Sequence, residues 1–361
     1  MADSIGERVR ELLPADQTHR EIALRVEMTP DAFSRSLSGQ RGFSAVELAR
    51  IADLLEADVH FLITGEADPL RLRMVARHDF DPATGRREVG GADRDRSMLD
   101  DVALAYRQAV EASLAASDIP SSVSDARAIL GERFVRPLIA RIEERFDIDV
   151  VRLPELSTSY SFTLGGRGVI LVPANGNWFY QNWCLAHELG HLSQRHTDPE
   201  TSADERDRHE EAANAFAAEL LLPTRMMQAQ NWSMMTVGQL AGLIWDWGVS
   251  IEAVVSRLRS LRIPLSNVLQ EWRSQPTQRL LRRHWSHQEV GEPITRRMEE
   301  AAVRRFPLAL QEAHVTLIAK GVLTKATLAW MLGVPESTLE VDEPTPAETM
   351  SVDSLADAFG L

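Results

Sequence analysis

The pentapeptide His187-Glu188-Leu189-Gly190-His191 constrains the fold of this chain more than any other feature. Residues four apart lie on one face of an α-helix, so His187 and His191 can present both imidazoles to one metal ion. Glu188 would lie beside them, where its carboxylate can take a proton from water that the metal activates. The spacing therefore predicts a helix with a Zn²⁺ centre. The alternative is an ordinary helix with two exposed histidines.

A tetrahedral catalytic site needs a third protein ligand. The segment that follows the motif offers five candidates: His196, Glu205, His209, Glu210 and Glu211. The alanine-rich run HEEAANAFAAELLLP, residues 209–223, predicts a second helix that can approach the first one closely. Glu210 would lie beside the apolar face of this helix, one turn before Asn214. A solvated acid in a first helical turn is the alternative for Glu210.

One stretch of the chain predicts a small β-sheet. Residues 149–153, 159–164 and 168–173 are short runs rich in β-branched and aromatic side chains, and the sequence Gly165-Gly166-Arg167-Gly168 predicts a hairpin between the second and third. Helical spacing dominates elsewhere, including residues 98–116, 124–145, 178–195 and 207–222. Residues 66–96 indicate a solvated linker or a hairpin. We therefore expect a mainly α protein with a small β-sheet.

The motif and its downstream helix resemble the ImmA/IrrE family of zinc metallopeptidases. The resemblance rests on HELGH and on the pattern E-x-x-x-N-x-F-A-A-E-L-L-x-P some twenty residues later, and it extends over residues 105–265. It implies an α+β, zincin-like domain in which His187, His191 and Glu210 bind zinc and Glu188 is the general base. Glu211 stays open as the third ligand.

The first 65 residues read as five short helices. Thr29 before Pro30, and Ser44 three residues before Glu47, are signals for helix starts. Residues 4–65 resemble the XRE (lambda-repressor-like) helix-turn-helix family, which implies binding to double-stranded DNA as a homodimer. The residues that would contact DNA by this resemblance are Thr29, Ser34, Arg35, Gln40 and Arg41. Residues 1–65 contain seven arginines and eleven acids, and this acidic balance weakens attraction to DNA phosphates.

Composition limits the remaining possibilities. The net charge of −14 gives no general attraction to nucleic acid, and the single cysteine, Cys184, fits a reducing compartment. Cys184 is either a core residue or a thiol near the metal. No apolar run is long enough to span a membrane, and the N-terminus does not resemble a secretory signal. We therefore expect a cytoplasmic protein without a membrane partner.

The C-terminal third matches no pattern that we can name. Eleven arginines and five acids lie between Arg257 and Arg305, with Trp272 and Trp285 among them. This composition indicates either a nucleic-acid or partner surface, or solvated arginines over a helical core. The predicted division of the chain is residues 1–66 (helix-turn-helix domain), 67–104 (linker), 105–265 (metallopeptidase domain) and 266–361 (helical region of unknown role).

The two resemblances together imply a regulatory protein. We expect a zinc-dependent endopeptidase that cleaves a repressor-type protein or the chain itself, joined to a DNA-binding domain. The alternative is a DNA-binding repressor or antitoxin that neutralises a co-expressed toxin and uses the peptidase fold for protein binding or sensing.

Overall fold

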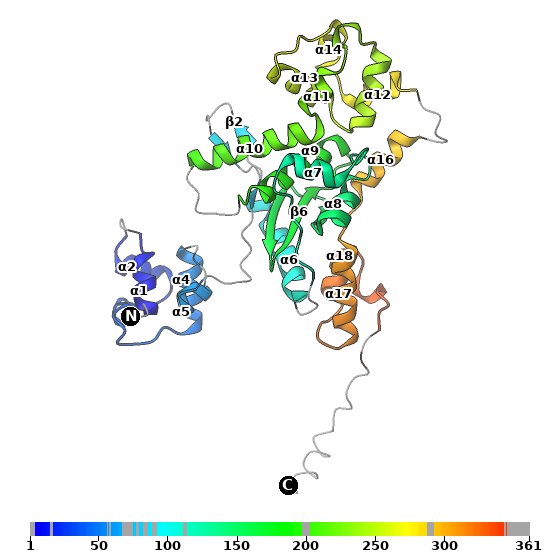
Figure 1. Ribbon diagram of the computed structural model, residues 1–361. Helices are drawn as coiled ribbons and strands as arrows, with labels where there is room; N and C mark the ends of the chain where they lie inside the picture. Colours follow the sequence, from blue (N-terminus) through cyan, green and yellow to red (C-terminus); the bar gives the residue numbers. More distant parts are fainter. Residues whose placement is uncertain are drawn as a thin grey trace. The chain divides into compact units, whose positions relative to one another are not determined.

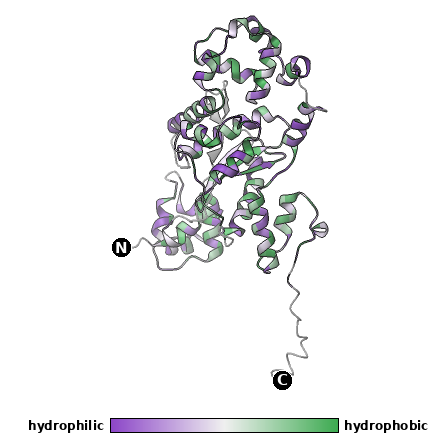
Figure 2. Ribbon diagram, turned by 45° about the vertical axis from the view of Figure 1, so that its right-hand side comes forward, coloured by the Kyte–Doolittle hydropathy of each residue, from purple (hydrophilic) through white to green (hydrophobic). Residues whose placement is uncertain are grey.

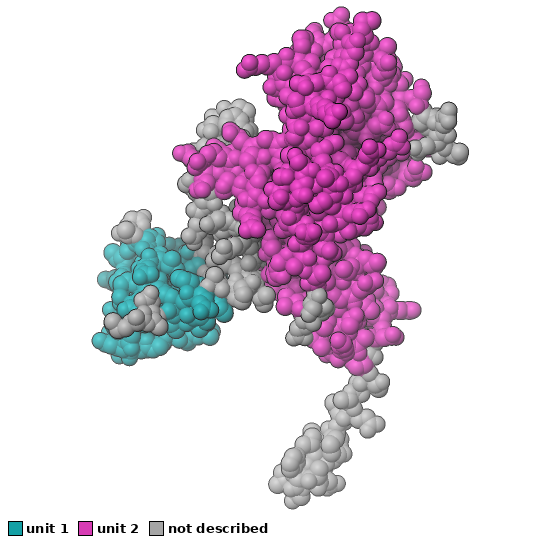
Figure 3. All heavy atoms as spheres, viewed as in Figure 1, with its two compact units in different colours: residues 1–71 teal, residues 72–361 magenta. Residues whose placement is uncertain are grey.

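A computed structural model describes most of the chain: residues 4–14, 17–55, 57, 59–66, 75–76, 79–81, 86–88, 92–110, 114–196, 203–286, 292–342 and 344. It divides into two compact units, Met1–Arg71 and Leu72–Leu361 (Figure 3). Each unit is described by itself below. The finer division of the second unit into peptidase and C-terminal domains stays a prediction. None of the described helices is both long and apolar enough to cross a bilayer.

The first unit consists of the five predicted helices: α1 (Ile5–Glu11), α2 (His19–Arg25), α3 (Pro30–Leu37), α4 (Ala45–Leu55) and α5 (Val59–Thr64). The predicted start of α4 is confirmed, because the Glu47 N–H donates to Ser44 Oγ at 3.2 Å and the Ser44 N–H donates to Glu47 Oε2 at 2.8 Å. Thr29 caps α3 as expected. A small apolar core that includes Phe33, Ile51 and Leu62 holds the helices together.

The second unit is built on a four-stranded sheet with the order β1 (Val75–Ala76), β5 (Tyr160–Leu164), β6 (Arg167–Pro173) and β4 (Asp149–Leu153). β4 runs parallel to β6, whereas β5 is antiparallel to β6 and to β1. Gly165 and Gly166 form the predicted hairpin turn, and both have positive φ angles (55° and 84°), which glycine adopts at little cost. The strands β2 (Asp79–Asp81) and β3 (Arg86–Glu88) pair separately.

Helices surround this sheet and confirm the mainly α fold (Figure 1). The helices of the second unit are α6 (Ala92–Gln108), α7 (Val123–Leu130), α8 (Leu138–Phe146), α9 (Trp178–Ser193), α10 (Ala203–Leu221), α11 (Thr224–Gln228), α12 (Val237–Trp247), α13 (Ile251–Ser260), α14 (Asn267–Trp272), α15 (Thr277–His284), α16 (Pro293–Ala302), α17 (Leu308–Ala319) and α18 (Ala326–Leu332). The 3-10 turn η2 (Trp232–Met234) lies between α11 and α12, and the 3-10 turn η3 (Glu336–Thr338) follows α18.

Two predicted helices differ from the observed ones. The pattern over residues 124–145 is split into α7 and α8, because Gly131 and Arg133 take positive φ angles (76° and 53°) that end the first helix. The helix predicted from residue 98 to 116 is α6, which spans Ala92–Gln108. Its early start carries Asp95 into the protein, where this side chain is 1% exposed and accepts a hydrogen bond from Tyr160.

The long helix α9 occupies the centre of the second unit. It packs on β5 and β6 on one side and against α10 on another. Thirteen of its sixteen residues are buried, so hydrophobic positions occur all round it rather than on a single stripe. The more peripheral helices alternate between hydrophilic and hydrophobic residues (Figure 2). The HELGH motif therefore lies on a deeply buried helix.

Candidate metal centre

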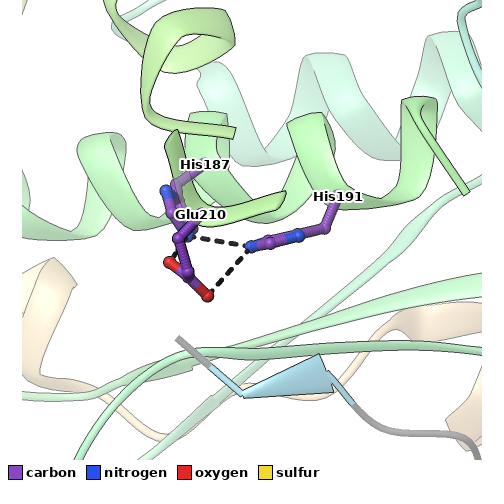
Figure 4. A group of neighbouring side chains, drawn as sticks. All are labelled: His187, His191 and Glu210. Carbon is purple, nitrogen blue, oxygen red and sulfur yellow. Dashed lines mark hydrogen bonds and ion pairs between the residues drawn. The ribbon is translucent and has the colours of Figure 1, made fainter. Parts of the chain in front are cut away.

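Three buried side chains from two helices converge at one point (Figure 4). His187 and His191 project from successive turns of α9, and Glu210 reaches them from α10. The two imidazole Nε2 atoms lie 3.1 Å apart, and the Glu210 carboxylate lies 3.2 Å from the first ring and 3.5 Å from the second. All three side chains are at most 2% exposed. The structure thus brings together the three residues that the sequence nominated as ligands.

These separations fit a single bound metal ion. Ligand atoms that bind one tetrahedral ion at about 2.0–2.2 Å lie about 3.3–3.5 Å from one another. The observed values of 3.1, 3.2 and 3.5 Å fall close to that range. Two imidazoles and one carboxylate are also a common donor set for a divalent transition metal. The cluster is therefore compatible with a metal ion.

Neighbouring side chains orient the two imidazoles. The Nδ1 atom of His187 lies 3.2 Å from Asn214 Oδ1, which can only accept a hydrogen bond. His187 must therefore carry its proton on Nδ1, and this leaves the Nε2 lone pair directed at the cluster. The Nδ1 atom of His191 lies 3.2 Å from that of His196. Burial, with the nearby charges of His209 and His191, lowers the pKa of His196 to about 4, so His196 is neutral at pH 7.

Glu188 is held by the sheet beneath α9. Its side chain is completely buried, and both carboxylate oxygens accept hydrogen bonds of 2.7 Å, one from Ser159 and one from Ser161. These serines lie two residues apart, so they share one face of the strand. Sequence reasoning missed both serines, as well as the role of Asn214. The alternation of SYSFT places the two hydroxyls on one face, but it does not indicate which helix covers them.

Close packing of α9 on α10 brings Glu210 to the histidines. Gly190, inside the motif, lies against α10, and a Cβ atom there would be 3.1 Å from Phe216 Cβ and 3.2 Å from Ala213 Cα. The absence of a side chain therefore sets the distance between the helices. Glu210 is buried on this side, whereas Glu211 is exposed. Of the two adjacent acids, Glu210 is the one that faces the cluster.

The other candidates around the motif take different places. His196 stacks on His209 with ring centroids 3.8 Å apart, next to His191. Glu205 is exposed on α10. Tyr160 donates to Asp95 at 2.8 Å, and burial followed by this bond raises its pKa. Cys184 is fully buried in the hydrophobic core.

The residues proposed to contact DNA lie on or near α3 in the first unit. Ser34 and Gln40 are exposed. Thr29 is also exposed, but its hydroxyl accepts the Ala32 N–H at 3.2 Å as the helix cap. Arg35 forms an exposed ion pair of 2.9 Å with Asp31, one turn earlier. The carboxylate of Asp31 therefore offsets the positive charge of Arg35 on this face.

Arg41 is more constrained than the other four residues. Its guanidinium donates to both carboxylate oxygens of Glu47, at 2.8 and 3.1 Å, and to Ser36 Oγ at 3.1 Å. These bonds tie the start of α4 to the end of α3. Arg41 therefore has a structural role in the bundle whether or not it meets a phosphate.

The fold and the site together define a helix-rich domain with a buried His-Glu-His motif and a carboxylate from a crossing helix. Comparison with known families agrees: residues 143–259 match the model of the Peptidase_M78 family, described as the IrrE N-terminal-like domain. The match runs from α8 to α13 and includes all of α9 and α10, and it supports a metallopeptidase domain. No curated protein and no solved structure gave a significant match.

Proposed function

We propose that the second unit is a zinc-dependent endopeptidase. The observation that carries this proposal is the buried group of His187, His191 and Glu210, with the Glu188 carboxylate on the same helix. A structural zinc site usually has four Cys or His ligands. Here the described residues provide three ligand atoms, of which one is a carboxylate, as in hydrolytic sites. Zinc would supply a Lewis acid that activates water and polarises the peptide carbonyl.

Side chains of this protein would transfer the proton and orient the reacting groups. Glu188 accepts a proton from water at a carboxylate oxygen and returns it to the leaving amine. Ser159 and Ser161 fix the orientation of that carboxylate through their two hydrogen bonds. Asn214 fixes the tautomer of His187. Because the His196–His209 pair lies next to His191, we assign the donor for the developing oxyanion to this pair.

The sheet next to Glu188 supports an extended peptide as substrate. Val75 and Ala76 pair in antiparallel fashion with Ser161 and Tyr160 of β5, so a strand of backbone lies directly beside the residues that hold Glu188. Strand addition of this kind recognises backbone and tolerates many side chains. The pairing favours either an extended segment of a repressor-type protein, which would replace β1, or a segment of this chain.

Metal content and cleavage test the proposal together. We expect about one zinc per purified chain by mass spectrometry, with strong loss in His187→Ala and Glu210→Ala and no change in the matched control Glu211→Ala. Glu188→Gln should keep the zinc but should no longer cleave a proteome-derived peptide library. Any self-cleavage that intact-mass spectra show for the wild type should also be lost in this variant. Equal zinc in all variants, or equal cleavage by wild type and Glu188→Gln, would overturn the proposal.

We also propose that the first unit binds double-stranded DNA through α3. The packing of α2 against α3 and the exposure of Ser34, Arg35 and Gln40 support this idea. The acidic balance of this unit requires that any contact be local, and a homodimer would add a second half-site. A gel shift with DNA from upstream of the coding region tests it, and the absence of a shift at low salt would contradict it.

A further inference from the structure

A cavity lies in the second unit, at the other end of α9 from the HELGH motif. It has a volume of about 270 Å³ and is lined by the first turn of α8, by β4, by the start of α9 and by α16. Four arginines line it, Arg136, Arg152, Arg297 and Arg305, against a single acid, Glu300. This local excess of positive charge contrasts with the net charge of −14 of the whole chain.

Arg297 is the most constrained of the four arginines. Its guanidinium lies over the rings of Trp178 and Trp245, at 5.1 and 5.3 Å from their centroids. Its buried Nη1 atom has no acceptor among the described residues. Burial, followed by the charge of Arg136, lowers its pKa to about 10, so it stays charged at pH 7. A fixed, charged donor without an acceptor is costly unless a ligand satisfies it.

A second arginine with an unused donor, Arg152, lies on β4. Its buried Nε atom also lacks an acceptor among the described residues, and its Nη1 atom makes only a long contact of 3.5 Å to Gln181. Arg305 differs, because its guanidinium is engaged by Glu143 and by the Val150 carbonyl. Arg305 therefore serves the fold, whereas Arg152 and Arg297 direct unused donors into the protein near the cavity.

The start of α8 also lines this cavity. Leu138, Ile139 and Ala140 form the first turn of this nine-residue helix and line the cavity. The N-cap residue, Pro137, provides no side-chain cap. The first N–H groups of a helix have no partner inside the helix, and the helix dipole favours an anion at this end.

We propose that this cavity, defined by Arg152, Arg297 and the first turn of α8, is a binding site for a phosphate group. Planar guanidinium groups and helix N–H groups together present donors in several directions, which suits a tetrahedral dianion better than a carboxylate. The volume admits a phosphate with a small attached group and excludes a folded partner. The ligand is thus inorganic phosphate or a small phosphomonoester.

The site also connects separate parts of the unit. Gln181 on α9 donates to the Ala301 carbonyl of α16 at 2.6 Å and to the Pro173 carbonyl of β6 at 2.7 Å. The start of α9 and α16 both line the cavity, so a bound phosphate would reinforce the attachment of α16 to α9. Because such a ligand binds the folded state, it should raise the melting temperature as its concentration rises.

Isothermal titration of the full metal-free chain tests this inference without any need for peptidase activity. Removal of any bound metal prevents phosphate from coordinating it at the histidines. Inorganic phosphate and ribose 5-phosphate are titrated separately. We expect saturable binding to one site, weakened about tenfold or more in Arg297→Gln and in Arg152→Gln. The matched control, Arg296→Gln on the exposed side of α16, should bind as the wild type does.

The two titrations distinguish inorganic phosphate from a phosphomonoester as the ligand. Tighter binding of ribose 5-phosphate would identify a phosphomonoester as the ligand, and equal binding would identify phosphate itself. Should Arg297→Gln fail to fold, as judged by near-UV circular dichroism, Arg152→Gln decides. No saturable binding of either compound to the wild type, or unchanged affinity in a folded Arg297→Gln variant, would overturn the inference.

Discussion

The metal centre and the exposed face of α3 are physical opposites. At the centre, His187, Glu188, His191 and Glu210 are at most 2% exposed. On α3, the side chains of Arg35 and Asp31 are 55% and 77% exposed and pair mainly with each other. Burial makes each polar contact strong and directional, whereas water and salt weaken an exposed pair. Substitutions should therefore have large and specific effects at the centre and small ones on α3.

We expect the largest effect on stability from a substitution at Gly190, where α9 contacts α10. In Gly190→Val the new side chain would press on Ala213 and Phe216, and α9 and α10 would have to separate. We expect a loss of about 1–3 kcal/mol in the free energy of unfolding, measured by denaturant titration. Zinc affinity should fall as well, because Glu210 moves with α10. Gly242→Val is the control, since a Cβ atom at Gly242 meets nothing within 4 Å.

Asn214 offers a sharper test of how the centre is preorganised. Asn214→Leu removes the acceptor of the His187 Nδ1 proton without touching a ligand atom. Zinc affinity, measured by competition with a chelator, should fall about 10- to 100-fold. Asn214→Asp keeps an acceptor at this position and should restore most of the affinity. Equal affinities in wild type and Asn214→Leu would show that the histidine needs no such support.

The two serines under Glu188 should affect catalysis but not metal binding. Ser159→Ala or Ser161→Ala removes one of the two hydrogen bonds to the carboxylate. If the proposed peptidase activity is correct, we expect about a tenfold lower kcat for each, because Glu188 loses orientation. Zinc content should stay at the wild-type level. Thr163→Ala lies on the same strand and is the control. Parallel loss of zinc and rate would point to a structural role instead.

The cluster of His187, His191 and Glu210 could be predicted from the sequence because its histidines obey helical spacing. His187 and His191 are one turn apart, and the alanine-rich helix that carries Glu210 follows soon after. The three main strands and the Gly165-Gly166 hairpin were confirmed for the same reason, since their signals are local. Local signals also explain the error at residues 124–145, where the apolar spacing continues through Phe134 and Val135 although the helix ends at Leu130.

What the sequence could not indicate depends on distant contacts. Ser159 and Ser161 reach a carboxylate 29 and 27 residues away, and neither is part of the motif. The arginine cavity is assembled from α8, β4 and α16, and its two unused donors, Arg152 and Arg297, are ordinary arginines in the sequence. Only packing decides that these guanidinium groups are buried without an acceptor.

The smallest effect on stability is expected on α3. Arg35→Ala removes an exposed pair with Asp31, and the free energy of unfolding should change by less than about 1 kcal/mol. Its effect on DNA binding should be larger, because the proposed contact surface loses its main cation. Arg50→Ala, which breaks the exposed pair between α4 and Glu27 in the turn after α2, changes the charge equally. If gel shifts weaken equally in both variants, attraction is merely electrostatic. Loss of the gel shift in Arg35→Ala alone would assign a specific role in DNA binding to α3. The exposed face of α3 would then be a functional site in its own right, as the buried cluster is proposed to be.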